Sequence, residues 1–160
     1  MELWLIFLCS SCRKLLPSSN YEITDHGPSA THAVANLTRS RPTAYIIPRT
    51  WSEVAAKLTA LGVTVETLTE PFIGIVESRN ITSSTLAPTF YEGTNLNTVT
   101  TSTGFQRSIA LPAGSFRVPT AQKNAALAFV ALEPENIDSF VSFNVIPLER
   151  GDEYPVFREV

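Results

Sequence analysis

Two pairs of neighbouring acids are the side chains whose type suggests catalysis: Glu133 with Glu135, and Asp152 with Glu153. A glycoside hydrolase uses two carboxyl groups that face each other across a cleft, about 5 to 9 Å apart. Acids this close in the sequence, placed in loops, are usually solvated and do not face each other across a cleft. We therefore assign neither pair a catalytic role.

Hydrolases that use a serine, a cysteine or zinc also need histidine, and the chain has only His26 and His32. No histidine follows position 32 that could act as a base for Ser115, the one serine on a predicted glycine turn. The two histidines are six residues apart and lack a carboxylate at ligand spacing. The CxxC pair, Cys9 and Cys12, lacks the second ligand pair or the thioredoxin-like surroundings that its chemistry requires. We predict no catalytic, cofactor-binding or metal-binding residue in this chain.

Composition excludes further classes of function. The 160 residues suit one domain, and 44% of them are hydrophobic, as in an ordinary folded chain. A net charge of -3 gives no basic surface for nucleic acid. The seven glycines do not form a phosphate-binding loop. Four aromatic residues could form a sugar-binding platform, although a ring at a helix start or strand end more often fills the core: Trp51, Tyr91, Phe105 and Tyr154.

The N-terminus contains an apolar run from Leu3 to Cys9, far shorter than the roughly 20 residues that span a bilayer. It could be the core of a signal peptide, although Glu2 precedes it and the basic pair Arg13-Lys14 follows it, the reverse of the usual charge order. The run is too short to span a membrane, so we expect no membrane span. Because the run could still serve as a signal peptide, we expect an extracellular location. In a secreted chain, the sequons at Asn36 and Asn80 could carry glycans.

Residues 13–42 are rich in Pro, Ser, Asn and Thr and show no lasting periodicity. We therefore expect a loosely ordered segment over residues 1–42 and a single domain over residues 43–160. The domain opens with a short apolar strand at 44–47, followed by a helix and a strand at 63–68. Together they form a βαβ unit whose two strands are expected to be parallel. Thr50 and Glu53 form a capping box for the helix, and Gly62 ends it. Its buried stripe is Val54, Leu58 and Leu61.

The rest of the domain is predicted to be mostly β. Pro112-Ala113-Gly114 marks a tight turn. A second helix over 121–132 has Thr120 as its cap and buries Ala125, Ala128, Phe129 and Leu132, and Pro134 prevents its continuation. A buried strand is expected at 72–76, with a bulge or close approach at Gly74, and further β segments at 79–85, 97–103, 106–110 and 115–118. Residues 90–93 are expected to be a strand end that runs into a turn after Tyr91, at Glu92-Gly93. Residues 153–158 are expected to be a final edge strand, because Pro155 removes one donor from the ladder. The fold class is α+β: a short βαβ opening, then a mostly antiparallel sheet or sandwich with a second helix.

Five pieces of the sequence carry a resemblance to a known family. They are PTAYIIPRTWSEVAAKLTALGVTVETL from Pro42, YEG from Tyr91, LPAGSFRVPTAQ from Leu111, ALEPENIDSFVSFN from Ala131 and EYPVFR from Glu153. Their order and spacing resemble the region that follows the catalytic domain in secreted zinc carboxypeptidase-like proteins of the carboxypeptidase A type. The resemblance implies a zinc ion held by His-x-x-Glu and a second histidine, with a glutamate as general base, all upstream of the matching region. Neither His26 nor His32 begins such a motif.

Two functions of different classes are compatible with these observations. In the first, the chain is a non-catalytic C-terminal accessory domain, or a truncated fragment, of a zinc carboxypeptidase-like protein, without activity or cofactor of its own. It would then pack against a carboxypeptidase catalytic domain through an exposed apolar patch. In the alternative, it is an independent secreted module that binds carbohydrate or cell-surface ligands through a row of exposed rings. Buried Trp51 and Tyr91 would favour the first, and a shared exposed face the second.

Overall fold

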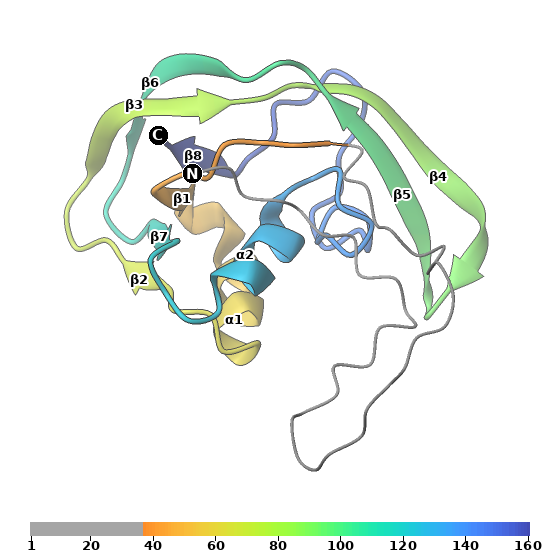
Figure 1. The fold of residues 1–160 in the computed structure, drawn as a ribbon, viewed down its shortest axis with the longest axis horizontal. Helices are drawn as coiled ribbons and strands as arrows, with labels where there is room; N and C mark the ends of the chain where they lie inside the picture. The colour runs from red at the N-terminus through yellow and green to blue at the C-terminus, as the bar shows by residue number, and fades with distance from the viewer. Residues whose placement is uncertain (1–36) are drawn as a thin grey trace, which may run out of the picture. The chain divides into compact units, whose positions relative to one another are not determined.

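A computed structural model describes residues 37–160, and the chain divides into two units, Met1–Ser40 and Arg41–Val160. The regular elements of the described residues all belong to the second unit (Figure 1). The strands are β1 (Ala44–Ile47), β2 (Glu66–Thr67), β3 (Phe72–Ser78), β4 (Ile81–Tyr91), β5 (Thr94–Thr101), β6 (Phe105–Leu111), β7 (Phe116–Pro119) and β8 (Phe157–Glu159). The helices are a 3₁₀ turn η1 (Arg49–Trp51), α1 (Ser52–Ala60) and α2 (Ala125–Leu132).

Six strands form one sheet in the order β2-β7-β1-β8-β3-β6, and every pair in it is antiparallel. Strands β1 and β2 both run antiparallel to β7, which lies between them, so they are parallel to each other without being neighbours. The predicted α+β class and its mostly antiparallel sheet are therefore confirmed.

The core lies on both sides of β1, whose four residues are all buried. Ile46 on one face joins Val76, Ile109 and Phe157 in an apolar cluster. Tyr45 points to the opposite face, as alternation along a strand requires, and its ring meets Phe129 of α2 edge-on at 6.1 Å between centroids. The helices supply the buried side chains predicted for them, apart from Leu61, which is 48% exposed.

Neither predicted helix cap is formed, and α2 starts later than expected. The backbone first makes the 3₁₀ turn η1, in which the Trp51 amide donates to the Pro48 carbonyl, so Thr50 lies inside the turn and no side chain caps α1. Helix α2 begins at Ala125 instead of residue 121. Thr120 does not cap it, because the Thr120 hydroxyl donates to the Pro42 carbonyl at 2.7 Å.

Three strand predictions also need correction. Strand β3 is not buried throughout, because Ile73 and Ile75 are 77% and 63% exposed on its outer side. Gly74 pairs regularly with β6 and forms no bulge; a Cβ there would lie 3.0 Å from the Phe72 ring. The C-terminal strand is central and not an edge, since β8 lies between β1 and β3.

Residues 72–111 form one long antiparallel β-ribbon, with β3 paired to β6 and β4 paired to β5. Only the β3–β6 half belongs to the six-stranded sheet; the β4–β5 half, residues 81–101, continues past it as a two-stranded arm (Figure 1). The arm turns at Glu92 and Gly93, whose φ angles are 50° and 87°. Two successive positive φ angles match the right-handed twist of a two-residue hairpin, and the predicted turn after Tyr91 is confirmed.

A buried ion network joins the sheet to α2. The guanidinium of Arg158 in β8 donates to Glu77 of β3 at 2.6 Å and lies 3.4 Å from the carboxylate of Glu133, just after α2. The Tyr45 hydroxyl donates to the same Glu133 carboxylate at 2.6 Å, and Arg79 pairs with Glu77 from the other side. Arg158 and Glu133 are each 4% exposed, so these partners replace the lost hydration.

The network shifts two pKa values in opposite senses. Burial, followed by the charge of Glu133, raises the pKa of Tyr45 well above its ordinary value, so its hydroxyl stays protonated as a donor. Burial alone would raise the pKa of Glu77 as well, but the guanidinium groups of Arg158 and Arg79 outweigh it and hold that pKa below its ordinary value.

Replacing Leu58 by alanine is expected to lower the free energy of unfolding by about 2 to 5 kcal/mol, because it removes a fully buried side chain and leaves a cavity. Leu61→Ala, at an exposed leucine one turn further on, should cost well below about 1 kcal/mol. Urea unfolding measures both. Equal losses would contradict the assigned facing of α1.

Acid is expected to destabilise the domain partly through Glu77. Because its pKa is lower in the folded than in the unfolded chain, its contribution to stability is complete above the ordinary glutamate value, about 4.3, and is lost as the pH falls through the folded value. The Glu77→Gln variant should therefore lose less stability between about pH 6 and pH 3 than the unmutated domain. Glu66→Gln is the matched control, since its surface pair with Arg117 is half exposed. Parallel pH profiles for the Glu77→Gln variant and the unmutated domain would contradict the role of this carboxylate.

Candidate functional site

The four acids considered for catalysis have other partners in the structure. Glu133 belongs to the buried network, so it is not solvated as expected, and Glu135 accepts the backbone N–H of Thr101 at 2.5 Å. Asp152 accepts the backbone N–H of Glu149 at 2.8 Å, and Glu153 pairs with Arg107 at 3.1 Å. These carboxylates bind backbone amides and guanidinium groups, so their contacts hold loops and strands together.

Ser115 is buried, and its hydroxyl donates to the Pro112 carbonyl at 2.8 Å, which closes the predicted turn around Gly114. Cys9, Cys12, His26, His32 and Asn36 lie outside the described residues. Among residues 37–160, no three His, Cys, Asp or Glu side chains gather closely enough to hold a metal ion. In the same residues, no helix is long and apolar enough to cross a membrane.

The four aromatic candidates do not share one environment. Tyr154 is 3% exposed and its hydroxyl donates to the Leu132 carbonyl at 2.6 Å, so it belongs to the core. Trp51 is half-buried in η1, Phe105 lies in β6, and Tyr91 is exposed at the end of the arm. Figure 1 shows α1, which follows Trp51, well apart from the arm's end. This placement matches neither expectation: Trp51 and Tyr91 are not both buried, as the accessory-domain function predicted, and a single row of exposed rings, which the binding-module alternative requires, is not supported.

A groove of about 770 Å³ lies between the arm and the segment that follows α2. Its lining residues are Ser84, Leu86, Asn97, Asn144, Pro147, Leu148, Glu149, Arg150 and Asp152. The polar groups at its floor bind one another: the hydroxyl of Ser84 and the amide of Asn97 both donate to the Leu148 carbonyl, at 2.9 and 3.3 Å. Asn97 is only 2% exposed. The contacts at this floor therefore anchor the base of the arm.

Two further contacts extend this anchoring along β5. The backbone N–H of Asn97 donates to the Ser142 carbonyl at 2.9 Å, and the amide of Asn144 donates to the Asn95 carbonyl at 2.7 Å. Asn144 has a φ of 55°, a left-handed conformation that asparagine tolerates better than most residues. The arm is thus held from one side almost as far as its turn.

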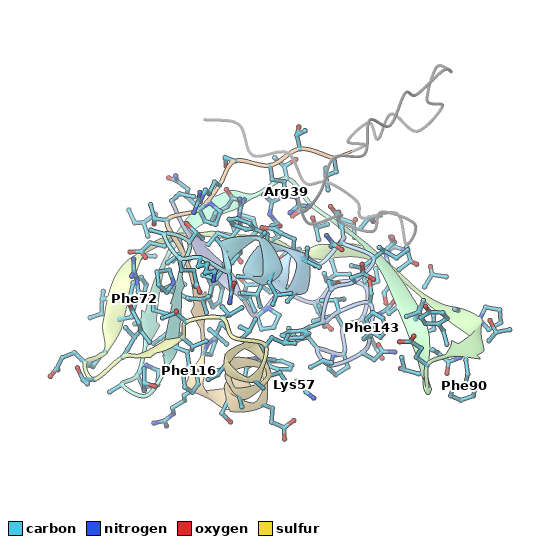
Figure 2. All side chains as sticks on the ribbon, turned by 60° about the horizontal axis from the view of Figure 1, so that its bottom comes forward. Arg39, Lys57, Phe72, Phe90, Phe116 and Phe143 are labelled. Atoms are coloured by element: carbon cyan, nitrogen blue, oxygen red, sulfur yellow. The ribbon has the colours of Figure 1, made fainter. Side chains whose placement is uncertain are left out.

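The β-ribbon gathers most of the exposed apolar surface of residues 37–160. Ten large apolar side chains there are exposed, and six of them lie on the ribbon. They form two groups, Ile73 and Ile75 on the outer side of β3, and Leu86, Phe90 and Tyr91 towards the end of the arm, with Phe105 at the start of β6. Figure 2 shows Phe90 at the free end of the hairpin. An exposed apolar patch is what an interaction surface requires.

The sequence reasoning singled out Tyr91 and Phe105 but missed Leu86, Phe90 and the two isoleucines. The isoleucines were expected inside because FIGIV has the continuous apolar pattern of a buried strand. A usable signal for the arm was its lack of charge, since residues 81–101 contain one charged residue, Glu92.

The sequence is similar to fungal proteins named carboxypeptidase 2. That of Trichophyton tonsurans is 54% identical over 130 residues, which are 81% of this chain and 24% of the relative. The protein of Trichophyton equinum has the same identity and coverage. The probable carboxypeptidase 2 of Arthroderma benhamiae is 48% identical over 110 residues, 69% of this chain and 21% of the relative. No protein-family model matches the chain, and no solved structure matches it significantly.

The resemblance to a C-terminal region of carboxypeptidase-like proteins, first inferred from five sequence pieces, is thereby confirmed. The match is partial, because the chain spans about a quarter of the length of the curated relatives. It corresponds to an accessory domain or to a fragment of a longer protein. The chain is homologous to a segment of the fungal carboxypeptidase 2 proteins.

Proposed function

We propose that residues 43–160 are a non-catalytic accessory domain that packs against the catalytic part of a secreted carboxypeptidase-like protein. The observation that carries this proposal is the 54% identity to a protein named carboxypeptidase 2, over about a quarter of its length. The exposed apolar side chains of the β-ribbon support it, since surfaces of this kind mark protein–protein contacts.

We place the zinc and the peptidase chemistry in the catalytic part. The resemblance implies a His-x-x-Glu motif, and the residues of this chain do not fit it, because Gly27-Pro28-Ser29 follows His26 and Ala33-Val34-Ala35 follows His32. No step of hydrolysis is therefore assigned to residues of this chain. Its role is to cover and stabilise the catalytic part, as buried surface between linked domains does.

Association can be tested by co-expressing the tagged chain with Trichophyton tonsurans carboxypeptidase 2 from which the matched segment has been deleted. We expect the two to purify together in equal amounts, because the matched segments are 54% identical and should present similar contact residues. The deleted protein expressed alone is the control, and we expect a much lower soluble yield from it. Equal soluble yields without co-purification would contradict the proposal.

Secretion would expose the sequon at Asn80 to glycosylation. Asn80 is exposed at the junction of β3 and β4, where its backbone, and not its side chain, makes the hydrogen bonds with Ser102. Expression through a eukaryotic secretory pathway should therefore give a glycan at Asn80 that glycosidase treatment removes. Mass spectrometry measures the site, and Asn80→Gln is the variant that should lose it. An unmodified Asn80 in secreted protein would contradict this prediction.

A further inference from the structure

The arm has the composition of a surface that is covered. Residues 81–101 contain one charged residue, Glu92 at the turn, whereas 17% of the whole chain is charged. Exposed edge strands in soluble proteins usually carry charges, lysine above all, that discourage pairing with other strands. The centres of protein interfaces, by contrast, are depleted in charge and enriched in aromatic side chains. Both strands of the arm lack charge, and β4 also carries two aromatic side chains, Phe90 and Tyr91.

At the end of the arm, the aromatic side chains are not covered by the residues that face them on the other strand. Phe90 is 77% exposed and faces Asn95 across the pair, while Tyr91 is 53% exposed and faces Thr94. A short polar partner cannot cover a ring, so most of each ring meets water. Leu86 is 58% exposed on the groove side of the same strand.

The arm is nevertheless held rigidly. An isolated two-stranded hairpin is at best marginally stable in water. Here the Asn97 and Asn144 contacts described above fix β5 from outside, and the Asn95 amide also donates to the Ala87 carbonyl at 2.8 Å across the irregular stretch of β4. A braced arm loses little conformational freedom when its end is buried, so binding through it is favoured.

We propose that the end of the arm is the docking element, inserted into an apolar cleft of the catalytic part of the same carboxypeptidase-like protein so that Phe90 and Tyr91, which alternate to opposite faces of β4, are both covered. This inference rests on the proposed function and names the surface that performs it. About three quarters of the length of the relatives lies outside the matched segment, enough for a partner domain on the same chain. Aromatic anchors dominate binding energy in interfaces, which favours this surface over the aliphatic pair Ile73 and Ile75 on β3.

The co-expression pair described above tests the inference when the chain carries Phe90→Ser together with Tyr91→Ser. The matched control carries Ile73→Ser and Ile75→Ser, which changes two equally exposed apolar side chains of the same ribbon. We expect the arm variant to recover at least about tenfold less partner, the range of an interface hot spot, and the β3 variant to recover the normal amount. Unchanged urea midpoints for both variants show that the fold is intact.

The possible results separate the two proposals. If the unmutated chain does not co-purify with its partner, the proposed function is wrong and the docking element with it. If the unmutated chain associates and the arm variant associates equally well, only the docking inference is overturned. Loss of association in the β3 variant alone would move the interface to Ile73 and Ile75. A dimer of the chain, seen by sedimentation and abolished only in the arm variant, would make the arm a self-association surface and overturn the inference.

Discussion

The burial of one guanidinium, that of Arg158, is the constraint on which the rest of the domain depends. A buried cation is tolerated only when its partners replace the lost hydration, and removing one partner of such a pair is costly. The partners of Arg158 come from elements far away in the sequence: Glu77 is 81 residues from it, and Glu133 also binds Tyr45, 88 residues from Glu133. Satisfying Arg158 therefore fixes β8, β3, β1 and the end of α2 relative to one another.

The same network determines where the arm leaves the sheet. Glu77 lies near the end of β3, and Arg79, in the junction before β4, pairs with it. Gly104, in the opposite junction, leaves the space that the Glu77 carboxyl group occupies, because a Cβ there would lie 2.5 Å from that group. A side chain at position 104 would have to displace the carboxylate from its two arginines. The ion network and the β-ribbon thus share Glu77 and Arg79, which lie near the end of β3 and in the junction where the arm begins.

Local signals in the sequence predicted local structure well. Gly62, Gly93 and Gly114 have positive φ angles at the turns where glycine was expected to end an element. Val54 and Leu58 in α1 are buried, as the helical spacing indicated. These features depend on backbone sterics and on periodicity, both of which a short stretch of sequence contains.

Predictions that depended on distant partners failed. Thr120 is a good helix cap by type, but its hydroxyl binds the carbonyl of Pro42, 78 residues away. Pro155 suggested an edge strand, yet it lies before β8, and nothing local shows that Phe157 and Arg158 enter the middle of the sheet. Ile73 and Ile75 have the pattern of a buried strand, and whether a second layer covers them is decided by the rest of the fold. Glu133 was expected in solvent because its guanidinium partner is 25 residues away.

The ion network and the arm differ in their charge and in their roles. Two charged residues, Arg158 and Glu133, are buried where the ion network holds the sheet against α2, while the projecting arm has one charged residue in 21. For an isolated domain this distribution is unfavourable, because an uncharged strand pair with exposed rings invites pairing with other chains. It becomes favourable when a partner covers the arm, since little charge then has to be desolvated at the contact. The base of the arm is part of the core, since Ile81 and Val99 are buried, whereas Phe90 and Tyr91 at its end are exposed and can contribute to binding without being needed for the core.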